Sequence, residues 1–412
     1  MKILYGGSGQ APNCATMEFY ISKKMRGVQP SAIREFFKYA SEPGIISLTA
    51  GNPAPEALPV EAMREIMSEI MGAQDVQKSL GYGISEGYAP LRERLKVYLR
   101  EEYGCFDEAR DDIIVTSGSQ QCMDLACRVL CDEGDVVICE APSFTGAMNA
   151  FRSFGVDLVG VPMQEDGIDV GLLEQALKEH KNVRFIYLIP NFQNPTGYTM
   201  SLEKRKICYE LAKKYGVPIL EDDPYGDLRF AGEAVPAIKT MDTDGIVLYA
   251  RSFSKVLAAG IRVGYMSFPK ELAGKLTVAK QCADVHTGTL SQLLCYNFLT
   301  QRDMAGHLRE IAGIYGRKCA VMVDELEKLP ADRISFSRPS GGLFVWATLH
   351  GVEDARDFVM RLVEVKKVVV VPGSGFFADQ RPGPNFRMTF AGASEEQITY
   401  AMRAIGEVFG SL

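Results

Sequence analysis

Residues 183–223, VRFIYLIPNFQNPTGYTMSLEKRKICYELAKKYGVPILEDD, decide the fold class. The segment begins with an apolar run at 183–191, and a second apolar run, PILEDD, closes it at 218–223. Residues 201–215 between them are predicted to form a helix. Continuous apolar strands that alternate with helices are typical of a parallel sheet covered by helices on both faces.

The same alternation extends outward in both directions from this segment. Further strands are predicted for DIIVTS, VVICEA, DLVGVPM, IVLYARS and RVGYMSF, and further helices for 119–131 and 169–180. We therefore expect an α/β fold with a three-layer, doubly wound, mostly parallel sheet. In such a sheet ligands bind at the carboxyl ends of the strands.

The chain ends have a different character from this centre. Helices are predicted at 31–40, 60–71, 90–102, 305–328 and 394–411, with strands in IISLTAG, GGLFVWATL, VVVVPG and NFRMTFAG. The expected plan is an arm and part of a small domain at 1–50, a large domain at 51–300 and a C-terminal small domain at 301–412. The smaller α+β domain is thus built from both ends of the chain.

Composition excludes several classes of function. A net charge of −7 over 412 residues argues against nucleic acid or an anionic membrane as the main partner. The ten cysteines form no CxxC pair and there are four histidines, so no metal site is predicted. Neither a signal peptide nor a run of about 20 apolar residues is present, which predicts a cytoplasmic protein.

The first motif with chemical meaning is SFSK, residues 252–255, followed by GIRVG at 260–264. Lys255 alone would be an ordinary solvated charge after a strand. Together with Ser252, Ser254 and Arg262, it supplies an amine nucleophile, two hydroxyls and a guanidinium. That set fits an aldehyde that carries a phosphate.

Three other motifs also end strands. ILEDDPYG, 219–226, places Asp222 and Tyr225 after an apolar run, where the acid is either part of a capped turn or the partner of a buried pyridine nitrogen. PNFQNPTG, 190–197, contains Asn194 in either a tight turn or a contact to a ring hydroxyl. TSGSQQ, 116–121, offers Ser119 and Gln120 as either a helix cap or a phosphate site.

In this order and at these separations, the four motifs resemble the fold-type I, class I and II aminotransferases from about residue 20 to the end. The motif sequences GSQQ, NFQNPTG and EDDPYG most resemble those of the subgroup of 2-aminoadipate, kynurenine and aromatic aminotransferases. The resemblance implies pyridoxal 5′-phosphate (PLP) as cofactor, amino acid and 2-oxo acid substrates, and a homodimer with shared active sites.

The resemblance also implies roles at the cofactor. Lys255 would form the Schiff base and shuttle the proton, and Asp222 would pair with the pyridinium nitrogen. Asn194 and Tyr225 would bind the ring hydroxyl, and Phe144 would stack on the ring where the subgroup commonly has tyrosine. The phosphate would be held by Ser119, Gln120, Ser252 and Arg262.

On the substrate side, the resemblance makes Arg387 in NFRMTF the clamp for the α-carboxylate, assisted by Gly51 and Asn194. Tyr82 matches a tyrosine contributed across the dimer interface to the phosphate or substrate. Arg26 is either a side-chain contact or a solvent-exposed residue of the N-terminal segment. Arg34 is expected on a helix surface, and Trp346 in the core of the small domain.

The resulting hypothesis is ping-pong transamination of amino acids with acidic or aromatic side chains. The alternatives are a PLP-dependent C–S lyase or decarboxylase on the same fold, and a non-catalytic PLP-binding sensor. A transcription regulator with such a domain would carry a helix-turn-helix segment before it, and no basic recognition helix is found in the roughly 20 residues that precede the resemblance.

Overall fold

The computed structural model describes residues 20–26, 28, 36, 38–39 and 42–409. Most of the helix predicted at 31–40, including Arg34, lies outside these residues. No helix of the described part is long and apolar enough to cross a membrane.

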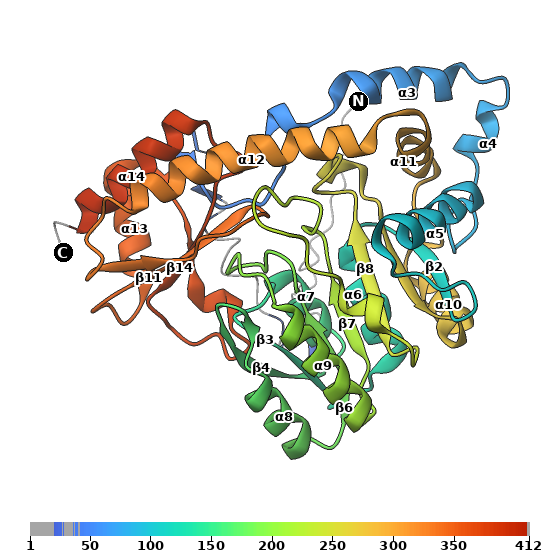
Figure 1. Cartoon of the computed structure of the whole chain (residues 1–412), viewed down its shortest axis with the longest axis horizontal. Coiled ribbons are helices and arrows are strands. Elements are labelled where there is room, and N and C mark those ends of the chain that lie inside the picture. Colours follow the sequence, from blue (N-terminus) through green and yellow to red (C-terminus); the bar gives the residue numbers. More distant parts are fainter. Residues whose placement is uncertain (1–19, 27, 29–35, 37, 40–41, 410–412) are drawn as a thin grey trace, which may run out of the picture.

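A large sheet forms the centre of the molecule and confirms the predicted α/β class (Figure 1). Its eight strands lie in the order β2-β9-β8-β7-β6-β3-β4-β5. Their bounds are β2 Asp111–Thr116, β3 Val136–Ala141, β4 Asp157–Gln164, β5 Gly167–Ile168, β6 Val183–Leu188, β7 Ile219–Asp222, β8 Val247–Ser252 and β9 Gly264–Pro269. Pairing is parallel from β8 through β7, β6 and β3 to β4, whereas β9 and the short β5 are antiparallel to their neighbours.

Both faces of this sheet are buried under helices, which explains the continuous apolar runs. On β6, Phe185 and Tyr187 belong to the core shared with α6 and α7, whereas Ile186 and Leu188 pack with α8 and α9. These helices span Ser119–Leu130 (α6), Thr145–Arg152 (α7), Val170–Glu179 (α8) and Leu202–Tyr215 (α9). Successive side chains point to opposite faces, so each strand must be apolar at every position.

A second, antiparallel sheet has the order β10-β11-β14-β13. Its strands are β10 Ile334–Phe336, β11 Phe344–Leu349, β13 Val371–Pro372 and β14 Asn385–Thr389, and it packs with α12 Met304–Leu326, α13 Ala355–Lys366 and α14 Glu395–Phe409. Figure 1 shows α12 extending from this part toward α11, Thr289–Gln301. The remaining helices are α1 Lys23–Arg26, α3 Val60–Gly72, α4 Val76–Leu80, α5 Ala89–Tyr103 and α10 Ala273–Asp284.

Two predicted strands, IISLTAG and VVVVPG, are shorter than the sequence suggested. VVVVPG is divided into β12, Val368–Val369, and β13, Val371–Pro372, which belong to different sheets. IISLTAG contributes only β1, Ile46–Ser47, which pairs in parallel with β12, Val368–Val369. The prediction was too long because the carbonyl groups of Thr49 and Gly51 accept side-chain hydrogen bonds from residues of a cavity, described below, and not from a strand. This pairing brings the two chain ends together. The domain limits at residues 50 and 300 stay predictions.

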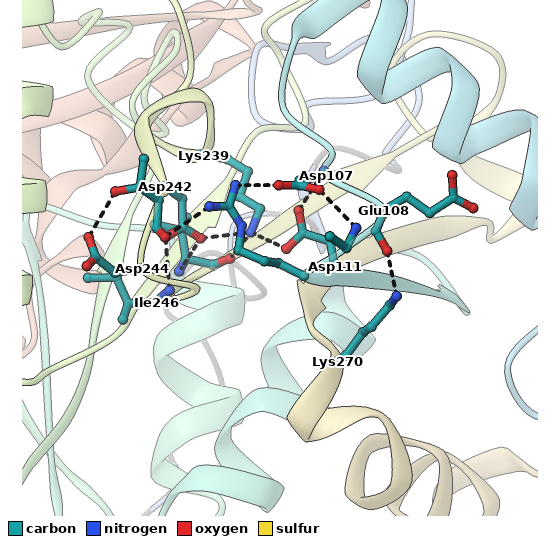
Figure 2. Close-up of polar contacts among 12 residues, drawn as sticks. Asp107, Glu108, Asp111, Lys239, Asp242, Asp244, Ile246 and Lys270 are labelled. Carbon is teal, nitrogen blue, oxygen red and sulfur yellow. Dashed lines mark hydrogen bonds and ion pairs between the residues drawn. The ribbon is translucent and has the colours of Figure 1, made fainter.

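A buried lysine, Lys239, connects residues at the edge of the large sheet where the parallel strands begin, called the amino edge below (Figure 2). Lys239 Nζ donates to Asp111 Oδ1 (2.8 Å), Asp242 Oδ2 (2.8 Å) and the carbonyl oxygen of Val247 (3.0 Å). Its three protons therefore have three acceptors, which is the condition for burying an ammonium group. The contacts join the starts of β2 and β8, at the edge opposite the carboxyl ends.

Candidate active site

A cavity of about 360 Å³ lies at the carboxyl ends of the parallel strands. It brings together nearly all of the residues that the sequence singled out: Gly51, Ser119, Gln120, Phe144, Asn194, Asp222, Tyr225, Ser252, Lys255, Arg262 and Arg387. Most of them follow the ends of five strands of the large sheet, β2, β3, β6, β7 and β8, whereas Arg262 precedes β9, Arg387 lies on β14 of the small sheet and Gly51 follows β1. The sequence predicted a ligand site at this edge of the sheet, and the cavity lies there.

Lys255 follows β8 and places its amine in this cavity. Its Nζ donates to the carbonyl oxygen of Gly51 at 2.7 Å. Burial, together with the positive charges of Arg387 and Arg262, lowers the pKa of the amine to about 8, against the opposing effect of the Asp222 carboxylate. Near neutral pH a much larger fraction of this amine is therefore uncharged than of an ordinary lysine, as a nucleophile or base requires.

Asp222 is the last residue of β7 and is fully buried at the cavity wall. Its Oδ2 accepts a hydrogen bond from Tyr187 Oη at 2.8 Å, whereas its buried Oδ1 has no partner among the described residues. Burial raises its pKa to about 7, against the hydrogen bond from Tyr187. An unpartnered buried carboxylate oxygen needs a cationic or N–H partner, so Asp222 fits the protonated ring nitrogen of PLP.

The start of α6 and the residues after β8 form an anion-binding end of the cavity. Gly118 precedes α6 at φ 79°, and an added Cβ there would lie 2.4 Å from Arg262 Nη2. The hydrogen bonds of Arg262 to Ser254 Oγ (3.4 Å) and to the carbonyl oxygen of Ser117 (3.4 Å) are long. With the hydroxyl of Ser119 and the amide groups of the first helical turn, the guanidinium therefore fits a phosphate.

Two aromatic side chains line the middle of the cavity. Phe144 precedes α7, and an added Cβ on Gly146 would lie 2.4 Å from its Cζ, so only glycine leaves room for this ring. The neighbouring carbonyl of Gly146 accepts from Gln120 Nε2 at 2.7 Å. Tyr225 is buried and packs edge-on against Phe344, with ring centroids 5.8 Å apart. Burial raises the pKa of its phenol, which therefore stays a hydrogen-bond donor.

Arg387 reaches the cavity from the small sheet. Its Nη1 donates to Asn194 Oδ1 at 2.8 Å and its Nη2 to the carbonyl oxygen of Thr49, while its buried Nε has no partner among the described residues. The guanidinium carbon lies 4.2 Å from the ring centroid of Phe344. Burial lowers its pKa to about 10, so the group stays charged near neutral pH. A buried guanidinium without a carboxylate partner is a binding site for an anionic substrate group.

Two predicted residues lie outside this cavity. Tyr82 is 92% exposed, and its ring is edge-on to His286. Arg26 is exposed and donates to Tyr20 Oη at 3.1 Å. Trp346 is also outside the cavity and is buried against Phe376.

Sequence reasoning missed two residues that complete the site. Phe344 lies under Arg387, and Tyr187 binds the carboxylate of Asp222. Both belong to apolar strands, where an aromatic residue ordinarily indicates core packing. For Phe344 the missing signal was the register of β11 against β14, which pairs Trp346 with Arg387 and so puts Phe344, two residues before Trp346, on the face of Arg387.

Comparisons with known proteins agree with this geometry. Residues 43–405 match the family model of aminotransferase class I and II. The chain is 38% identical to aromatic-amino-acid aminotransferase 1 of Thermococcus litoralis, over 95% of this chain and 94% of that protein. It is 36% identical to 2-aminoadipate transaminase of Thermus thermophilus, over 93% and 95% of the two chains.

A solved structure is similar over the same extent. The kynurenine aminotransferase of Pyrococcus horikoshii, solved in complex with PMP, superposes with a TM-score of 0.91 and 35% identity, covering 95% of this chain and 97% of that one. Arrangement, motifs and overall similarity lead to the same conclusion. The chain belongs to the class I and II aminotransferases and is a PLP-dependent transaminase of fold type I.

Proposed function

We propose that the protein transfers the amino group of an α-amino acid with an acidic or aromatic side chain to a 2-oxo acid. The observation that supports this proposal is the presence of two groups in one cavity, the amine of Lys255 with its lowered pKa and the charged guanidinium of Arg387. One can act on the Cα proton of an amino acid while the other holds its carboxylate. The side-chain preference is supported by the relatives, which are named for aromatic amino acids, 2-aminoadipate and kynurenine.

The cavity residues would hold PLP in one orientation. Ser119, Gln120, Ser252 and Arg262 would bind the phosphate, Phe144 would pack on the ring face, and Asn194 and Tyr225 would donate to the ring hydroxyl oxygen. Asp222 would accept from the ring nitrogen, and Lys255 would hold the aldehyde carbon through Nζ. When bound in this way, PLP withdraws electrons from the substrate Cα.

The protein then controls where the substrate proton goes. Arg387 fixes the carboxylate, which leaves the Cα–H bond as the one presented for cleavage. In its uncharged form, which the lowered pKa makes accessible, Lys255 Nζ would accept the proton from the substrate Cα and release it again toward the bound cofactor. Because the carboxylate is held, its loss is disfavoured, and transamination is favoured over decarboxylation.

The direct experiment is a half reaction with the purified enzyme and one amino acid in the absence of any oxo acid. Transamination should convert the bound cofactor to pyridoxamine phosphate and yield one 2-oxo acid per site. A panel of amino acids should then show the highest kcat/KM for glutamate, 2-aminoadipate, kynurenine or the aromatic residues. Release of ammonia or carbon dioxide without pyridoxamine phosphate would instead identify a lyase or decarboxylase.

We also propose that the active form is a homodimer in which Tyr82 reaches the partner's cavity. Support comes from the exposure of Tyr82 together with that of its apolar neighbours Leu80 (60%) and Ile84 (55%), because a patch of this kind is costly in water. Mixing Lys255→Ala with Tyr82→Ala subunits should restore activity, since each hybrid contains one intact site. The absence of any gain after subunit exchange would refute the shared site. Arg26, held by Tyr20 outside the cavity, is proposed as a substrate contact only in that dimer.

A further inference from the structure

The buried Tyr187 lies next to the cavity, and its hydroxyl binds a residue of the cavity wall. Tyr187 lies on β6 and pairs in register with Leu220 of the neighbouring β7, two residues before Asp222. Its side chain is fully buried, and its ring packs edge-on against Phe151 at 5.3 Å between centroids. The hydroxyl is therefore held in one place, 2.8 Å from Asp222 Oδ2.

The hydrogen bond from Tyr187 makes the two oxygens of the Asp222 carboxylate different from each other. Oδ2 is occupied by a donor from behind, and Oδ1 is left as the buried oxygen without a partner. Burial and the neighbouring charge of Asp223 raise the pKa of Asp222, and the hydrogen bond from Tyr187 is the larger of the two influences that lower it, ahead of the charge of Lys255. A hydroxyl that donates to a buried carboxylate favours the charged form and restricts rotation of the group.

We propose that Tyr187 is a positioning residue for the cofactor. It fixes the rotation of the Asp222 carboxyl group and keeps it ionised, so that Oδ1 faces the ring nitrogen of PLP and holds its proton. The inference rests on the role proposed above for Asp222, and Tyr187 itself touches neither cofactor nor substrate.

The chain contains a matched control on the next strand. Tyr249 on β8 is also fully buried, and its hydroxyl donates to Asp223 Oδ2 at 2.7 Å. Asp223 does not line the cavity, and its Oδ1 already accepts from Asn191 Nδ2 (3.0 Å) and from the amide of Gly226 (2.9 Å). Tyr187→Phe and Tyr249→Phe thus remove the same kind of bond from neighbouring carboxylates, of which only one faces the cofactor.

The test compares the two variants as purified full-length holoenzymes. Equilibrium dialysis should show PLP bound about tenfold more weakly by Tyr187→Phe, the equivalent of about 1.4 kcal/mol for one charge-assisted hydrogen bond. With PLP labelled at its ring nitrogen, the ¹⁵N resonance should move toward the neutral pyridine position. The kcat should fall while the KM for the amino acid stays the same. Tyr249→Phe should match the unmodified enzyme in all three measurements.

Three other results would contradict the inference, and they can be told apart. Equal PLP affinities and ¹⁵N shifts in both variants would mean that the Tyr187 hydroxyl does nothing for the cofactor. A Tyr187→Phe protein that unfolds while Tyr249→Phe stays folded would make the hydroxyl structural. Asp222→Ala serves as the reference for the underlying assignment: if it also leaves the ¹⁵N shift unchanged, the role of Asp222 itself fails and not merely that of Tyr187.

Discussion

The reaction of Lys255 with PLP should depend on pH with an inflection near 8. Burial and the nearby charges of Arg387 and Arg262 together lower the pKa of this amine from its ordinary 10.5 to about 8. Only the uncharged amine attacks an aldehyde, so the rate should fall about tenfold for each pH unit below the inflection. At pH 7 about 9% of the amine is uncharged, compared with about 0.03% for an ordinary lysine, a roughly 300-fold advantage.

Arg387→Gln tests the electrostatic part of this explanation. Removing a cation makes the ammonium form of Lys255 less unfavourable, so its pKa should rise by about one unit and the inflection should move to higher pH. The rate at pH 7 should then fall about tenfold. Arg110→Gln provides the control, because it removes the same charge at the amino edge of the sheet, where Arg110 pairs with Asp107.

The assay is stopped-flow absorbance after mixing cofactor-free protein with PLP between pH 7 and 10. That range lies above the second ionisation of the phosphate near pH 6, which would otherwise contribute its own pH dependence. A rate that still rises steeply at pH 10 in the unmodified protein, without an inflection in this range, would refute the lowered pKa. An unchanged inflection in Arg387→Gln would show that the charge of Arg387 does not contribute to the lowered pKa.

Three further predictions concern the substrate, the phosphate and the sheet. Arg387→Lys cannot bind a carboxylate with two parallel bonds, so the KM of the amino acid should rise about tenfold to a hundredfold, and an unchanged KM in steady-state assays would contradict the clamp. Gly118→Ala should weaken the binding of PLP in equilibrium dialysis, because the added Cβ would lie 2.4 Å from Arg262 Nη2 at a φ of 79°. Unchanged binding would mean that Arg262 can shift to make room for the Cβ without losing its contact with the phosphate. Lys239→Met leaves two buried carboxylates unpaired and should lower the free energy of unfolding by about 3–5 kcal/mol in denaturant titrations, whereas full stability would show that they are neutral there.

The layout of the large sheet could be predicted from the sequence because local patterns determine it. The apolar runs of β6 and β7, with α9 between them, follow from burial on both faces. Motif residues at strand ends, such as Lys255 and Asp222, then meet because parallel strands end at one edge. The predicted strand length was wrong where backbone carbonyl groups accept hydrogen bonds from side chains that are distant in the sequence. IISLTAG is apolar enough for a longer strand, but its last carbonyl groups receive bonds from Lys255 and Arg387, residues more than 200 positions away.

Tyr187 and Phe344 mark the second limit of prediction from sequence. Each is an aromatic residue in an apolar strand, and period-two alternation places it on one face or the other without saying what it meets there. What makes Tyr187 relevant is its 2.8 Å distance to Asp222, and what makes Phe344 relevant is the guanidinium 4.2 Å from its ring. Both depend on register between strands, which is a property of the folded chain.

The two ends of the cavity are therefore built on different principles. The cofactor end uses residues from neighbouring strand ends of one sheet, where backbone hydrogen bonds hold adjacent strands about 4.8 Å apart. The substrate end depends on Arg387 of the small sheet meeting Asn194 of the large one through a 2.8 Å hydrogen bond. A change in the packing between the two sheets would move the carboxylate site relative to Lys255 while leaving the cofactor contacts intact. Substitutions between the sheets should accordingly alter kcat/KM for the amino acid before they alter PLP affinity, and the reverse order would argue that the cavity behaves as one rigid unit.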